Sequence, residues 1–68
     1  MAEQTYTVTG MTCEHCVRSV TEEVGELAGV TSVAVDLPTG AVTVTSERAL
    51  TDDEVRGAVT EAGYTLTA

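Results

Sequence analysis

Cys13 and Cys16 are the residues of this chain whose type and spacing best suit chemistry. Residues three apart on a helix lie on one side of it, so both sulfurs would face the same way. A position at the start of a helix lowers thiol pKa values, because free N–H groups and the helix dipole favour negative charge there. Two thiolates can bind one soft cation, and thiolate ligands select Cu(I). The spacing therefore indicates a site for a soft metal ion.

Other chemistries use a C-x-x-C pair as well. Small dithiol oxidoreductases also have it between a strand and a helix, although their fold needs more chain than 68 residues supply comfortably. Zinc usually takes four ligands, or three protein ligands at a catalytic site, and this chain has two cysteines and one histidine. A structural disulfide is disfavoured in a reducing compartment. An oxidoreductase and a carrier of mercury or zinc remain as alternatives to Cu(I).

Two structural elements must position the cysteines. Alternating apolar and polar residues over 4–9 predict a half-buried strand, which Gly10-Met11-Thr12 interrupts. Thr12 is then placed to cap a helix whose first turn holds both cysteines. The helix should stop at Gly29. Its apolar stripe follows steps of three and four, at Val17, Val20, Val24 and Leu27.

The rest of the chain predicts a hairpin, a helix and a short strand. Valine-rich segments at 30–37 and 41–45 are expected to pair, because Pro38-Thr39-Gly40 favours a turn between them. Thr51-Asp52-Asp53-Glu54 fits a capping box, which predicts the start of a second helix that ends at Gly63. A last short strand is expected around Tyr64 and Leu66.

The element order is thus βαββαβ, and each strand has one apolar face and one threonine-rich face. Right-handed crossovers then place both helices on one face of a four-stranded antiparallel sheet. We expect an α+β ferredoxin-like sandwich, with residues 1–68 as a single domain. This topology places the cysteine loop, the turn at 38–40 and Gly63-Tyr64 at one end. Residues 52–54 should lie at the opposite end.

The net charge of the chain limits the kinds of partner that it is expected to bind. The chain has 11 acidic residues, 3 arginines, no lysine and a net charge of −8. Nucleic-acid binding requires a basic surface, and an anionic membrane would repel this chain. The acidity suits a protein partner with a basic surface. Glu14, Glu61 and Asp36 are the acids expected near the cysteine end, so we predict that they take part in docking.

Size and termini suggest a carrier in the cytoplasm. A domain of 68 residues has little room for an enclosed substrate pocket, so we do not expect an enzyme. No stretch approaches the roughly 18 apolar residues of a membrane span. The segment from Met1 to Gln4 lacks the basic and apolar regions of a signal peptide. We therefore expect a cytoplasmic protein that does not insert into the membrane.

The segment Gly10 to Cys16, G-M-T-C-E-H-C, resembles the G-M-T-C-x-x-C signature of heavy-metal-associated domains. The valine-rich hairpin, Gly40 and Ala62-Gly63-Tyr64 also sit where that family has them. The length is similar to that of bacterial CopZ-type copper chaperones. The resemblance implies a chaperone that binds Cu(I) through Cys13 and Cys16. It also implies transfer, by thiolate ligand exchange, to the metal-binding domain of a copper-exporting P-type ATPase or to a copper-responsive repressor.

Three further residues surround the expected metal loop. Met11 of the M-x-C-x-x-C motif is a candidate thioether ligand, although a role in packing beneath the loop is favoured. His15 lies between the cysteines and is a solvent-exposed residue, an extra ligand, or a modulator when two molecules share copper. It would lie at the contact if two copies formed a copper-bridged homodimer. Tyr64 corresponds, by the resemblance, to a residue that packs near the metal loop.

Overall fold

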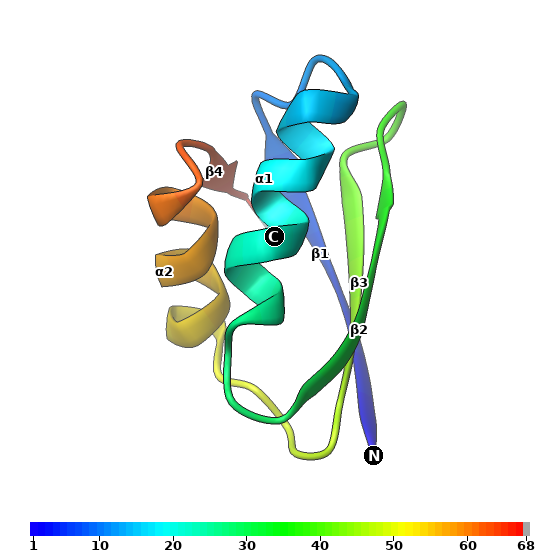
Figure 1. Cartoon of the computed structure of the whole chain (residues 1–68), viewed down its shortest axis with the longest axis vertical. Helices are drawn as coiled ribbons and strands as arrows, with labels where there is room; N and C mark the ends of the chain where they lie inside the picture. Colours follow the sequence, from blue (N-terminus) through cyan, green and yellow to red (C-terminus); the bar gives the residue numbers. More distant parts are fainter. Residues whose placement is uncertain (68) are drawn as a thin grey trace.

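The computed structural model describes residues 1–67, and Ala68 lies outside the described part. The elements are β1 (Ala2–Thr9), α1 (Glu14–Gly25), β2 (Val30–Asp36), β3 (Ala41–Ser46), α2 (Asp52–Glu61) and β4 (Thr65–Leu66). The strands form one antiparallel sheet in the order β2-β3-β1-β4. Both helices cover the same face of this sheet (Figure 1). The expected ferredoxin-like sandwich is confirmed.

The core is built largely from valine. Strand alternation turns Tyr6 and Val8 of β1 and Val42 and Val44 of β3 toward the helices, where they are buried. The helices contribute the other fully buried apolar side chains: Val20 and Val24 from α1, and Val55 and Val59 from α2. The opposite face of the sheet carries threonines such as Thr5 and Thr43, whose hydroxyls lie 3.2 Å apart. One face is therefore packed and the other polar, as the sequence pattern predicts.

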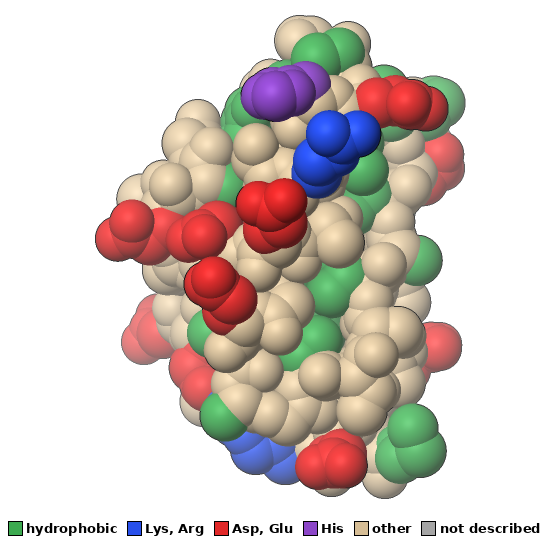
Figure 2. Space-filling view, in the orientation of Figure 1, with side chains coloured by type: hydrophobic (Ala, Val, Ile, Leu, Met, Phe, Trp, Pro, Cys, Tyr) green, Lys and Arg blue, Asp and Glu red, His purple; other side chains and the backbone are tan. Residues whose placement is uncertain are grey.

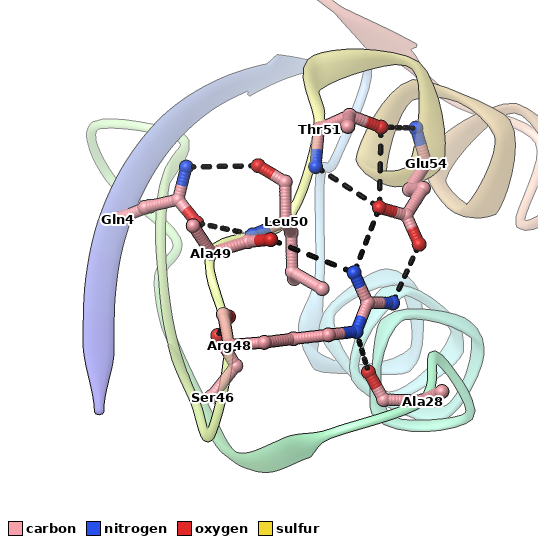
Figure 3. A network of polar contacts seen from close by, with 8 residues as sticks. All are labelled: Gln4, Ala28, Ser46, Arg48, Ala49, Leu50, Thr51 and Glu54. Atoms are coloured by element: carbon pink, nitrogen blue, oxygen red, sulfur yellow. Dashed lines mark hydrogen bonds and ion pairs between the residues drawn. The ribbon is translucent and has the colours of Figure 1, made fainter.

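The start of α2 is held by the expected capping box and by an arginine. The Thr51 hydroxyl accepts from the Glu54 backbone N–H (3.2 Å), and the Glu54 carboxylate accepts from the Thr51 N–H (3.0 Å). The Arg48 guanidinium donates to both Glu54 oxygens, at 3.1 and 2.6 Å, and its Nε donates to the Ala28 carbonyl at 3.0 Å (Figure 3). This network joins the α1–β2 connection to α2. The pKa of Glu54 is lowered to about 2, first by Arg48 and then by the Thr51 N–H.

Two expectations about α1 are wrong. Cys13, in extended backbone geometry, occupies the N-cap position in place of Thr12, and no side chain caps the helix. The helix ends at Gly25, four residues before Gly29. It ends there because the chain leaves the helix in a tighter turn, in which the Leu27 N–H bonds the Val24 carbonyl at 3.1 Å. The apolar stripe therefore runs past the helix into the loop at Leu27.

Strand boundaries differ from the expected ones by one or two residues. The first strand starts at Ala2, the hairpin strands are 30–36 and 41–46, and Tyr64 precedes the last strand. The distribution of segments between the two ends is as expected. At one end, the Val8 N–H donates to the Gly40 carbonyl at 2.9 Å, which joins β1 to the hairpin turn. The cysteine loop lies at this end, which we call the cysteine end, and α2 begins at the other (Figure 1).

Candidate functional site

A short loop between β1 and α1 carries the two cysteines. β1 ends at Thr9, and the loop passes over the end of the core, where Met11 is partly buried against the core cluster. The Cys13 carbonyl accepts from the N–H groups of Cys16 (3.0 Å) and Val17 (3.3 Å), so the helix starts directly beneath the first cysteine. Met11 thus anchors the loop to the core, which is the packing role expected of it.

Both cysteines are free thiols, and their sulfurs lie 3.7 Å apart. Bonds of about 2.3 Å, the length of a zinc–thiolate bond, allow one ion to contact two sulfurs as much as about 4.6 Å apart. The observed separation is therefore short enough for both to bind the same ion. Cys13 is exposed and Cys16 is partly buried, so the pair is open to solvent on the Cys13 side.

The surroundings of Cys16 stabilise its thiolate. Its pKa is lowered to about 6, first by the Thr12 backbone N–H and then by the Tyr64 hydroxyl, with a smaller contribution from Cys13. Partial burial opposes this shift without cancelling it. The same contact raises the pKa of Tyr64, because the phenol is held as the donor to the sulfur. These contacts therefore favour the thiolate form of Cys16 at neutral pH.

The other predicted residues come from several elements of the fold. His15 is exposed on the first turn of α1 and Tyr64 is half-buried beside Cys16. Glu14, Asp36 and Glu61, the expected docking acids, are all exposed. The Asp36 carboxylate accepts from the Thr39 hydroxyl at 2.9 Å in the hairpin turn.

The role of Thr12 was missed by sequence reasoning. Its backbone N–H acts on the Cys16 sulfur, and its hydroxyl lies 3.9 Å from that sulfur, whereas its sequence position indicated a helix cap. No local pattern distinguishes these two roles, because both place a threonine directly before the helix.

In the described part of the chain, the cysteine pair is not joined by a third thiol, imidazole or carboxylate. Within residues 1–67, no three or more His, Cys, Asp or Glu side chains gather in a group able to hold a metal ion. A four-ligand site of the kind that zinc prefers is therefore not assembled from the described residues. None of the helices in this part of the chain has the length and apolar character needed to cross a membrane.

Comparison with known proteins assigns this chain to a family. The family model of the heavy-metal-associated domain matches residues 5–65. The chain belongs to this family. Among its relatives, the COP-associated protein of Helicobacter felis is 41% identical over 59 residues, which cover 87% of this chain and 89% of that protein. The copper chaperone CopZ of Bacillus subtilis is 38% identical over 65 residues, or 94% of each chain.

Other heavy-metal-associated domains are parts of larger proteins. A probable copper-exporting P-type ATPase of Archaeoglobus fulgidus is 36% identical over 63 residues, which cover 91% of this chain and 8% of the ATPase. Among solved structures, a CopZ metallochaperone superposes with a TM-score of 0.89 at 28% identity, covering 97% of this chain and all of that one. The yeast copper transporter domain Ccc2a gives 0.84 at 28% identity, covering 94% and 89%. The heavy-metal-associated fold is therefore shared by free-standing carriers and transporter domains.

Proposed function

We propose that this protein is a copper chaperone that binds Cu(I) through Cys13 and Cys16 and delivers it to another protein. The observation that carries the proposal is the pair of free thiols 3.7 Å apart on a surface loop. Similarity over 94% of the chain to the copper chaperone CopZ of Bacillus subtilis supports it. No covalent bond of a substrate is made or broken in such a transfer, so we propose a carrier and not an enzyme.

The donor set favours Cu(I) over the other metals considered. Two thiolates satisfy a soft d10 ion such as Cu(I), whereas zinc requires further ligands. Within residues 1–67 no third His, Cys, Asp or Glu side chain joins the two cysteines in a metal-binding group, so a further ligand would come from water or another chain. Mercury shares the softness of copper, and the similarity to copper chaperones favours copper between the two.

Delivery is proposed to proceed by thiolate exchange. A thiolate of the acceptor bonds to the two-coordinate Cu(I), a three-coordinate intermediate forms, and one of the original Cu–S bonds breaks. We infer that the Cys13 bond breaks first, because Cys13 is exposed whereas Cys16 is partly buried and held by Thr12 and Tyr64. Copper stays Cu(I) throughout, and the released sulfur takes a proton from solvent or remains a thiolate.

The proposed acceptor is the metal-binding domain of a copper-exporting P-type ATPase in the cytoplasm, or a copper-responsive repressor. The first is supported by the likeness to a segment of the Archaeoglobus fulgidus ATPase, since two similar domains can bring their metal loops face to face. Glu14, Asp36 and Glu61 are proposed to border this contact. In the absence of an acceptor, a second copy of the chain can share the ion, with His15 at the contact.

An anaerobic Cu(I) titration against a competing chelator tests the proposal. We expect wild-type protein to take up Cu(I), and Cys13→Ser and Cys16→Ser each to lose it to the chelator, because one thiolate does not retain the ion. His15→Ala is the matched control from the same turn and should retain Cu(I) binding. Near-wild-type affinity in either cysteine variant would refute the assignment.

A redox assay distinguishes the proposed chaperone from the main alternative, a dithiol oxidoreductase. A thiol with a pKa of about 6 is also suited to disulfide exchange. We expect no catalytic turnover in an insulin-reduction assay, since copper transport needs no electron transfer. Sustained turnover that both cysteine variants abolish would favour a dithiol oxidoreductase over a chaperone.

A further inference from the structure

Most carboxylates of this chain have no cationic partner. The structure contains two ion pairs within residues 1–67, Arg48–Glu54 at 2.6 Å and Arg56–Asp53 at 3.2 Å. The remaining nine acids form no ion pair there, and eight of them are exposed. They are Glu3, Glu14, Glu22, Glu23, Glu26, Asp36, Glu47, Asp52 and Glu61. Figure 2 shows acidic side chains spread over the helical face of the molecule.

Several of these acids occupy positions where negative charge is unfavourable. Glu22 and Glu23 lie in the last turn of α1, Glu26 caps its C-terminus, and Glu61 ends α2. The C-terminal end of a helix is the negative end of its dipole, and neither last turn contains a basic residue. Glu22 and Glu26 are also four residues apart, a spacing at which like charges on a helix repel. Arg18 lies four residues before Glu22 on the same helix but forms no ion pair with it within residues 1–67. The placement of these acids is therefore unfavourable when little salt is present.

The core has little capacity to offset this repulsion. The largest fully buried side chains are valines and one serine, Ser46. Valine is one of the smaller apolar residues, and a domain of this length buries only about 60% of its surface on folding. Net stabilities of small domains are small differences between large terms. A few repulsive pairs are therefore enough to shift the balance between folded and unfolded chains.

We propose that this protein is built to fold in concentrated salt, where dissolved monovalent cations supply the counterions that its own sequence lacks. The screening length is about 10 Å at 0.1 M and about 3 Å at 1 M salt. One helical turn spans about 5.4 Å, so neighbouring glutamates repel across it in dilute buffer and are screened in molar salt. This inference concerns the metal-free chain and does not depend on the proposed copper transfer.

Urea unfolding of the reduced, metal-free protein near pH 7 tests the proposal, in KCl from about 0.05 M to about 2 M. The urea concentration at the wild-type unfolding midpoint should rise steeply with KCl. A wild-type chain that is already unfolded without urea in the most dilute buffer would support the proposal most strongly. The double variant Glu22→Gln/Glu26→Gln should be more stable than wild type at low salt, and its midpoint should rise less steeply with KCl. Asp53→Asn is the matched control, because it removes an acid that has an arginine partner, and it should not raise stability at low salt.

Two results would overturn the inference. One is a wild-type midpoint that stays the same across the KCl range. The other is a parallel salt dependence in wild type and the Glu22/Glu26 double variant, which would mean that salt acts on apolar burial and not on these carboxylates.

Discussion

The Tyr64 hydroxyl and the Cys16 sulfur act on each other across the cysteine end, although they come from opposite ends of the sequence. The phenol lowers the pKa of the thiol, and the thiol raises the pKa of the phenol. The loop between α2 and β4 therefore helps to set the ionisation of a thiol carried by the loop between β1 and α1. A strand-to-helix loop alone would provide only the Thr12 N–H and Cys13 for this purpose.

The pH dependence of alkylation at Cys16 should reveal the effect of Tyr64 on the thiol. With a pKa of about 6, about nine in ten Cys16 thiols are ionised at pH 7, so iodoacetamide should modify Cys16 with a midpoint near pH 6. Tyr64→Phe removes a donor to the thiolate, so the midpoint should move upward. Mass spectrometry of the alkylated peptides after short exposures gives the rates for each cysteine separately. Tyr6→Phe is the matched control, because Tyr6 lies in the core and its hydroxyl is buried. An equal shift in both variants would exclude a specific role for Tyr64.

Protonation of Glu54 at acidic pH should lower the free energy of unfolding of the domain. Its pKa is about 2 in the folded chain, against an ordinary value of 4.5, because Arg48 and the Thr51 N–H favour the carboxylate. A lowered folded pKa gives a contribution that is complete above pH 4.5 and is lost as pH falls toward 2. We expect Glu54→Gln to be less stable than wild type near neutral pH, and the difference to shrink through this range. Urea unfolding at fixed high salt measures it, with Glu47→Gln as the unpaired control.

The helix glycine Gly57 and the loop glycine Gly63 should respond oppositely to alanine. At both positions a Cβ atom would meet nothing within 4 Å, so steric space does not distinguish them. Gly57 lies inside α2 without a positive φ, and Gly57→Ala should stabilise the protein by roughly 0.5–1 kcal/mol. Gly63 has a φ of +96°, so Gly63→Ala should destabilise it by roughly 1 kcal/mol or more. Thermal unfolding compares the two, and a shift in the same direction for both would contradict the backbone argument.

Charge at the cysteine end should affect copper transfer more than charge at the far end. At the lowest salt concentration at which wild type and variants are all folded, Glu14→Lys and Glu61→Lys should slow transfer severalfold with little change in Cu(I) affinity, because a basic acceptor would be attracted less. Asp52→Lys and Asp53→Lys are the far-end controls and should matter much less. Stopped-flow mixing with a purified metal-binding domain of a copper-exporting ATPase measures the rates. Equal effects of both sets, or rates independent of salt, would argue against electrostatic docking at this end.

Local sequence patterns predicted those parts of the fold that depend on local interactions. The capping box at Thr51 and Glu54 involves residues three apart, so it could be identified without the fold. The alternation of Tyr6 and Val8 also gave the buried face of β1 correctly. Thr12 was misassigned, because a helix start gives the same local signal whether the residue caps the helix or contacts a neighbouring thiol.

Contacts between distant segments were beyond the reach of the sequence patterns. Arg48 donates to the Ala28 carbonyl only because the α1–β2 connection comes close to the β3–α2 connection, and no motif encodes that approach. The effect of Tyr64 on Cys16 likewise requires β4 to lie beside β1, as the pairing of Val8 with Leu66 shows. The ligand residues could be proposed from spacing, whereas the asymmetry between Cys13 and Cys16 required the three-dimensional structure.

Gly40 ties the hairpin turn to the strand that leads into the metal loop. Its carbonyl accepts from the Val8 N–H, its φ is +76°, and a Cβ atom there would lie 2.5 Å from the Val8 carbonyl oxygen. Backbone cannot yield as a flexible side chain would, so any larger residue must push the turn away from β1. If codon 40 is randomised and the library is selected for growth on copper, only codons for glycine should survive. This is expected although Gly40 is not a proposed metal ligand. The close approach of two backbone segments, and not the chemistry of the site, therefore determines which codons are tolerated here.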